Sequence, residues 1–126
     1  MTRRTLAKLL AVLGLVGLPL VVVTCVNVPD EIPGHPGAAQ QIRALYEARA
    51  LERGGYCTLP RIRTITDSRV VSENADRLVL EVRYYYEPFA DQDLQRGTCK
   101  DFATRTFTFA RRGAGWELQG MSGAQR

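Results

Sequence analysis

The sequence predicts an α+β domain in which one N-terminal helix packs on an antiparallel sheet of about four strands, preceded by a transmembrane or signal segment. Three observations lead to this prediction. Residues 9–29 are uncharged, residues 38–53 show helical periodicity and end at two glycines, and apolar residues alternate with polar ones from about residue 61 onward. The predicted order is therefore a leader, a linker, a helix and then strands.

Residues 1–28 predict a signal anchor or a signal peptide. Lys8 is the last charged residue before Asp30, and at about 1.5 Å per residue the run between them can cross the roughly 30 Å hydrocarbon core of a bilayer. The run lacks an A-x-A cleavage site and basic residues precede it, so the positive-inside rule places the rest of the chain outside the cytoplasm. We expect residues 9–28 to hold the chain in a membrane.

Two features of the leader resemble bacterial export signals and leave alternatives open. Arg3-Arg4 resembles the arginine pair of a twin-arginine signal. Cys25, preceded by Val22-Val23-Thr24, resembles the cysteine of a bacterial lipobox, which makes it a possible site of lipid attachment. The chain is then an anchored protein, a lipoprotein or a cleaved secreted protein. Each outcome places the domain on the periplasmic side of a bacterial inner membrane.

The three cysteines predict one disulfide. An odd count in an exported protein leaves one cysteine over, and Cys25 at the membrane edge is the natural odd one. Cys57 and Cys99 then pair in an oxidising compartment, closing a loop worth roughly 4 kcal/mol in the chain-entropy model. The alternative is two reduced cysteines. The cysteine spacing fits no zinc site, and His35 is the only histidine, so we expect no metal.

The predicted domain covers residues 38–123 and follows a Pro/Gly linker at residues 29–37, which contains His35 as a solvated loop residue. The helix at residues 38–53 buries a face that includes Ile42 and Tyr46, while Glu52 projects elsewhere. Gly54-Gly55 ends it. Four strands are expected after the helix, at residues 61–72 (interrupted near Asp67-Ser68), 77–87, 102–111 and 116–121.

The strand at residues 77–87 suggests a ligand pocket. Alternation places Tyr84 and Tyr86 on the same face as Leu78, Leu80 and Val82. If the helix leaves part of the sheet open, these two rings and Phe107 of the next strand line an apolar pocket. The alternative is that all three residues are core.

The order of one helix followed by strands, with the long strand RLVLEVRYYYE and the terminal stretch RRGAGWELQGMSG, resembles the cystatin-like and nuclear-transport-factor-like α+β folds. The resemblance covers residues 38–123 and concerns architecture only. It implies a helix laid across one face of a curled sheet. Such folds host enzymes, binding modules and assembly factors alike, so the resemblance implies no particular activity.

The remaining observations bear on function. Arg3, Arg4 and Lys8 account for most of the net charge of +4, since 14 basic and 13 acidic residues follow Cys25 and leave a net of +1 there. We therefore expect no nucleic-acid binding. A lone histidine in a linker gives no catalytic constellation, and no cofactor is implied. The sequence favours a non-enzymatic, membrane-tethered periplasmic protein that binds an unknown envelope protein or serves an envelope assembly. The alternatives are a binding module for a small apolar ligand and a secreted enzyme inhibitor.

Overall fold

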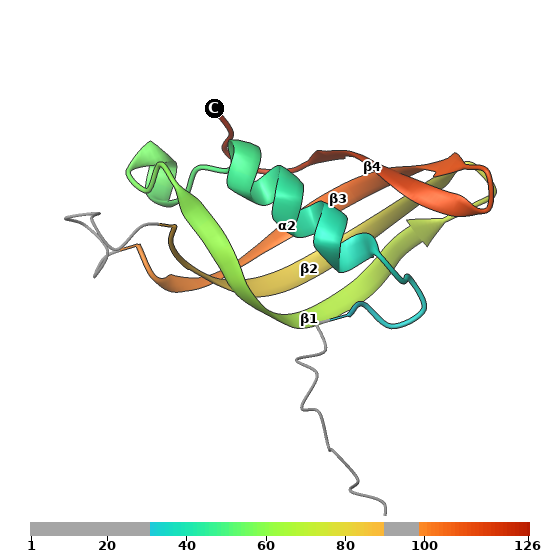
Figure 1. Cartoon of the computed structure of the whole chain (residues 1–126), viewed down its shortest axis with the longest axis horizontal. Coiled ribbons are helices and arrows are strands. Elements are labelled where there is room, and N and C mark those ends of the chain that lie inside the picture. Colours follow the sequence, from blue (N-terminus) through green and yellow to red (C-terminus); the bar gives the residue numbers. More distant parts are fainter. Residues whose placement is uncertain (1–30, 90–98) are drawn as a thin grey trace, which may run out of the picture.

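The computed structural model describes residues 31–89 and 99–126. They form one helix and four antiparallel strands in the sheet order β1-β2-β3-β4, with α2 lying across one face (Figure 1). The elements are α2 (Ala38–Arg49), a 3₁₀ turn η1 (Arg53–Gly55), β1 (Pro60–Glu73), β2 (Arg77–Pro88), β3 (Asp101–Arg112) and β4 (Gly115–Met121). The predicted α+β arrangement of one helix on four antiparallel strands is confirmed.

The leader lies outside the described residues, and with it the predicted membrane segment at residues 9–28 and Cys25. Within residues 31–89 and 99–126, none of the helices has the length and apolar character needed to cross a membrane.

The core lies between α2 and the inner face of the sheet. Strand alternation turns Leu78, Leu80 and Val82 of β2 inward, and none of the three is more than 1% exposed. The helix contributes Ile42 and Tyr46, both fully buried, at the i and i+4 positions of one face. This two-layer packing is the arrangement that the alternating periodicities predict.

The helix ends four residues earlier than the sequence suggested, at Arg49 instead of residue 53. Ala50 is already extended, and the Leu51 N–H donates to the carbonyl of Ala124 at 3.0 Å. Glu52 then bridges Cys57 in an antiparallel pair. Contacts with the C-terminus and with the chain before β1 therefore replace the last predicted helical turn. They also turn Glu52 into the domain.

The described part of the predicted linker packs on the sheet. Ile32 is 3% exposed and belongs to the core cluster. The His35 side chain is only 11% exposed, with its Nε2 3.8 Å from Glu73 Oε1, which differs from the solvated loop expected. An apolar residue among prolines and glycines, Ile32, is the sequence signal for this packing.

Both outer strands show features that the sequence did not reveal. β1 is continuous, and the interruption expected near Asp67-Ser68 is instead a register shift against β2 between Ile65 and Asp67. On the opposite edge, Gln41 of α2 accepts from the Leu118 N–H at 2.8 Å and donates to the Trp116 carbonyl at 2.9 Å. Its side chain occupies edge positions of β4 that another strand would otherwise pair with.

Candidate functional site

The predicted cysteine pair is present. Cys57 and Cys99 form a disulfide, and both side chains are 1% exposed. The bond joins the segment that follows η1 to the segment that precedes β3. It therefore braces the end of the domain where α2 ends and β1 begins.

The predicted ligand-pocket residues lie in the core. Tyr84, Tyr86 and Phe107 are 0%, 3% and 0% exposed and belong to one core cluster with Ile42 and Tyr46 of α2. The Tyr46 ring packs edge-on against the Tyr84 ring, with centroids 5.0 Å apart. This burial favours the core alternative, and a ligand site among these three residues stays a prediction.

A buried polar cluster forms around Arg105 and includes the hydroxyl of Tyr84. Arg105 projects inward from β3 between the positions of Ala103 and Phe107, and its side chain is 5% exposed. Its Nη2 lies 3.1 Å from Glu52 Oε1, and its Nε donates to the Tyr84 hydroxyl at 2.9 Å. Tyr46 and Tyr84 both donate to the same Glu52 oxygen, at 2.9 and 2.6 Å.

Backbone carbonyls accept hydrogen bonds from the remaining N–H groups of the Arg105 guanidinium. Nη1 donates to Ser122 at 2.8 Å and to Ala124 at 3.1 Å, and Nη2 donates to Leu51 at 2.5 Å. Among the described residues, every buried side-chain nitrogen and oxygen has a hydrogen-bond partner. The cluster thus joins the segment after α2, β2, β3 and the C-terminus, and it leaves Arg105 no donor for a ligand.

Burial sets the protonation of the cluster. Desolvation, reinforced by the negative charge of Glu52, raises the pKa of Tyr46 and of Tyr84 well above the ordinary 10.0. For Arg105, burial alone would lower the pKa, but Tyr84 and Glu52 more than offset this and raise it. The hydroxyls therefore stay neutral donors and the guanidinium stays charged. We interpret the cluster as a structural centre of the domain.

Sequence reasoning could have found Arg105 but not its partner. In FATRTFTFAR, alternation places Arg105 on the face of Phe107 and Phe109, where a charge needs an acidic partner. The partner, Glu52, was assigned to the outer face of a helix that in fact ends before it.

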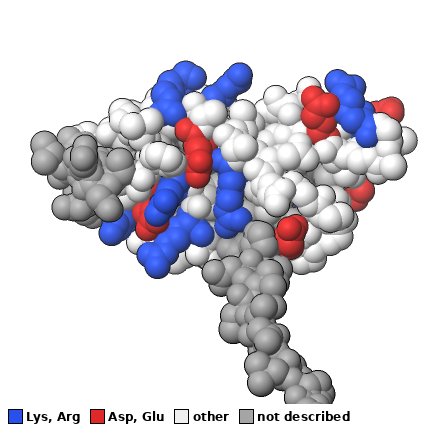
Figure 2. Space-filling model, viewed as in Figure 1, with Lys and Arg blue, Asp and Glu red and all other residues white. Residues whose placement is uncertain are grey.

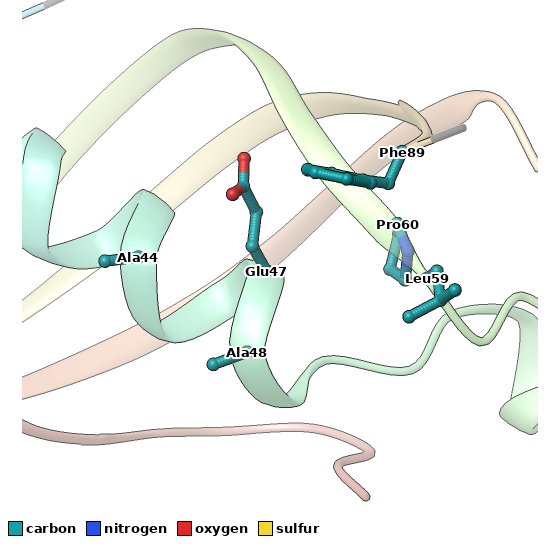
Figure 3. Close-up of a pocket in the computed structure, with 6 residues that line it drawn as sticks. All are labelled: Ala44, Glu47, Ala48, Leu59, Pro60 and Phe89. Carbon is teal, nitrogen blue, oxygen red and sulfur yellow. The ribbon is translucent and has the colours of Figure 1, made fainter. Parts of the chain in front are cut away.

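An apolar groove of about 460 Å³ lies between the exposed side of α2 and the start of β1. Figure 3 shows its lining, formed by Ala44, Glu47 and Ala48 of α2, by Leu59 and Pro60 at the start of β1, and by Phe89 after β2. The Phe89 N–H donates to the Leu59 carbonyl at 2.9 Å, which holds these two residues side by side. Leu59 is 53% exposed and Phe89 57%, so the groove is open to solvent.

Among the described residues that line the groove, Glu47 is the only charged one. Its side chain extends from α2 toward Phe89 (Figure 3). The guanidinium of Arg126 donates to the Glu47 and Ala48 carbonyls, both at 2.9 Å, and also to Thr58. These bonds hold the C-terminus at the end of α2 beside the groove. Figure 2 shows that basic side chains gather on this view of the molecule toward the end where α2 finishes.

Sequence reasoning missed the groove, although two signals point to it. Ala44 and Ala48 are small residues four positions apart on the outer helix face, where a groove can form above them. Pro88 ends β2 and leaves Phe89 beyond the sheet. Nothing in the sequence alone shows that Leu59 and Phe89 meet.

The described residues contain no cluster of three or more histidine, cysteine or acidic side chains that could hold a metal ion. No protein-family model, curated protein or solved structure matches the chain. The cystatin-like resemblance therefore rests on architecture alone, and the groove is the candidate functional site.

Proposed function

We propose that the chain is a non-enzymatic, membrane-tethered periplasmic protein whose domain binds a protein partner of an envelope assembly through the groove. The apolar leader at residues 9–28 supports the tether. The Cys57–Cys99 disulfide supports an oxidising compartment.

The exposure of Leu59 and Phe89 in one groove is the observation that carries the binding role. Single exposed apolar residues are ordinary on protein surfaces, but here two face a hollow whose floor is alanine and proline. Burying a fully exposed leucine or phenylalanine side chain contributes roughly 1.5–3 kcal/mol, and Leu59 and Phe89 are each a little more than half exposed. A partner that covers both gains enough for a small, transient interface.

Charge selects the kind of partner. Glu47 places a carboxylate at an apolar wall. The nearby guanidinium of Arg126 is directed at the backbone carbonyls of Glu47 and Ala48. The segment that fits is an apolar side chain flanked by lysine or arginine, because the basic group then meets Glu47 at the rim.

The volume of the groove favours one alternative, a small apolar ligand. Small-molecule sites enclose about 300–1,000 Å³, and 460 Å³ falls within that range. In this alternative the ligand occupies the groove.

The test uses the full chain in nanodiscs with methyl-labelled alanine, observed by NMR. The probes are two synthetic peptides with the same Leu-Phe centre, one flanked by lysines and one by glutamates, together with 1-octanol. We expect the lysine-flanked peptide to shift the methyl signals of Ala44 and Ala48. The Glu47→Lys variant should weaken binding of the lysine-flanked peptide and strengthen binding of the glutamate-flanked peptide.

The Leu59→Ser and Phe89→Ser variants should abolish the shifts. Tyr56→Ser is the matched control, because Tyr56 is also 53% exposed but does not line the groove. Equal shifts from both peptides would contradict the charge argument. Methyl shifts caused by octanol alone would support the small-ligand alternative. If none of the three probes shifts the Ala44 and Ala48 methyl signals, the groove is not a binding site.

A further inference from the structure

The first buried residue of the described chain is close in sequence to the predicted membrane segment. Ile32 is 3% exposed and lines a small surface hollow together with Ser68 and Val70 of β1 and Leu80 of β2. In Figure 1 the segment that precedes α2 runs alongside β1. Ile32 is therefore the first buried residue among those described, and it comes before the end of the predicted linker at residue 37.

Chain length limits how far the domain can stand from the bilayer. Four residue steps separate Val28, the end of the predicted membrane segment, from Ile32, and they span at most about 14 Å. If Cys25 carries a lipid instead, seven steps separate it from Ile32 and span at most about 25 Å. In either case the middle of β1 lies within reach of the headgroup region.

The surface at this place suits a membrane interface. Val70 and Val71 are adjacent and 46% and 47% exposed, on an edge strand whose register against β2 shifts between Val70 and Ser72. Arg69 stands next to them, 65% exposed, and pairs with Glu81 at 2.8 Å. Apolar side chains bordered by a basic one are the composition that rests at the boundary between headgroups and acyl chains.

We propose that β1 docks on the bilayer that holds the tether, with Val70 and Val71 at the headgroup boundary and Arg69 toward the phosphates. This inference rests on the tether of the proposed function but not on the groove. It gives the domain a fixed orientation, with one strand toward the membrane, in place of free rotation on a spacer.

The test uses the full chain in nanodiscs of phosphatidylcholine and phosphatidylglycerol, with methyl-labelled valine and alanine. A fraction of the lipid carries a gadolinium chelate on its headgroup, which broadens nearby methyl signals. We expect selective loss of the Val70 and Val71 signals, with the signals of buried Val82 and of Ala44 in the groove retained. The unmodified chain alone gives this pattern, so the result does not depend on a variant that folds.

The V70E/V71E variant should remove the selective loss, because glutamates are repelled by anionic headgroups. Thr104→Glu, at another exposed strand position but on β3, is the control and should leave the pattern unchanged. Uniform broadening, or loss centred on Ala44, would overturn the docked orientation while leaving the tether intact.

Pairing of the β1 edge with a second copy, seen as contacts between labelled and unlabelled chains at Val70, would overturn it in favour of a dimer. A chain that does not stay with the nanodiscs would contradict the tether itself, and with it this inference.

Discussion

Glu52 and Arg105 form an ion pair inside the domain, with Oε1 and Nη2 3.1 Å apart and side chains 11% and 5% exposed. The pair joins the segment that follows α2 to the middle of β3, two regions 53 residues apart in the sequence. Two tyrosine hydroxyls donate to the same carboxylate oxygen. Burying two charges is tolerated here because each is paired and hydrogen-bonded.

Removing one member of the pair should be strongly destabilising. Arg105→Met leaves the Glu52 carboxylate buried without its counter-charge, and loss of one partner of a buried pair typically costs about 3–5 kcal/mol. Urea unfolding followed by circular dichroism measures this. The double variant Glu52→Gln/Arg105→Met should lose less than the sum of the two single variants.

The matched comparison is the surface pair between Arg112 and Glu117, which are 64% and 56% exposed. Arg112→Met should cost no more than about 1 kcal/mol, since exposed ion pairs contribute little. Equal costs at Arg105 and Arg112 would show that burial does not strengthen the inner pair.

A glycine beside the cluster gives a second prediction. Gly123 has a φ of +86°, and a Cβ at this position would lie 2.7 Å from Arg105 Nη1. Gly113, in the hairpin between β3 and β4, has a φ of +58° and nothing within 4 Å of an added Cβ. Both Gly→Ala changes carry backbone strain, of order 1 kcal/mol, but only Gly123→Ala also displaces Arg105.

We therefore expect Gly123→Ala to lower the free energy of unfolding more than Gly113→Ala. In an Arg105→Met background the difference between the two should shrink, because the obstructing guanidinium is gone. A difference that persists there would assign the effect to the backbone alone.

The sequence was sufficient for the parts of the fold that depend on local periodicity. The alternation in RLVLEVRYYYE placed Leu78, Val82 and Tyr84 in the core, and that of β3 placed Phe107 there. Cys57 and Cys99 could be paired because the third cysteine lies in the leader. These features need only the order of residues along one element.

The parts that failed depend on contacts between distant segments. The end of α2 at Arg49 is set by hydrogen bonds to residues near the C-terminus, which helical propensity does not register. The burial of Ile32 depends on how the segment before α2 lies against β1 and β2, which the local sequence does not determine. The groove requires Leu59 and Phe89 to meet, and only the pairing of β1 with β2 brings them together.

Stability should decrease at alkaline pH because of the buried tyrosines. In the folded chain the pKa values of Tyr46 and Tyr84 lie above the ordinary 10.0, so the unfolded chain releases these protons first. The contribution of the neutral hydroxyls is complete below pH 10 and is lost progressively above it. Urea unfolding at pH values from 9 to 11.5 measures the slope.

The variants Tyr46→Phe and Tyr84→Phe each remove one titrating proton. Each should therefore reduce the slope of the unfolding free energy against pH by up to about 1.4 kcal/mol per pH unit. An unchanged slope in both variants would mean that the hydroxyls ionise equally in the folded and unfolded chains, contrary to their burial.

The Gln41 contact to β4 predicts a local effect. Gln41→Leu leaves the Trp116 carbonyl and the Leu118 N–H without their partner, at a cost of about 1–3 kcal/mol. Hydrogen exchange of the Leu118 amide should become faster, while amides in the centre of β2 change little. Gln40→Leu is the control, because Gln40 is the exposed neighbour on the same helix. Equal exchange in the two variants would contradict an edge-sealing role for Gln41.

Reduction of the disulfide should destabilise the domain without abolishing its fold. Cys57 and Cys99 are 42 residues apart, and the chain-entropy model assigns a loop of that length about 4 kcal/mol. Adding a reductant should lower the urea midpoint of the natural chain and leave that of a Cys57→Ala/Cys99→Ala variant unchanged, because the latter has no bond to lose. The difference in urea midpoint between the two proteins in reductant measures how much the packing of the buried thiols contributes.

Both proteins also carry Cys25→Ser, which prevents thiol–disulfide exchange with the leader cysteine. A natural chain whose midpoint does not respond to reductant, although mass spectrometry shows the bond broken, would mean that the contacts of α2 and the C-terminus hold this end of the domain without the covalent bond.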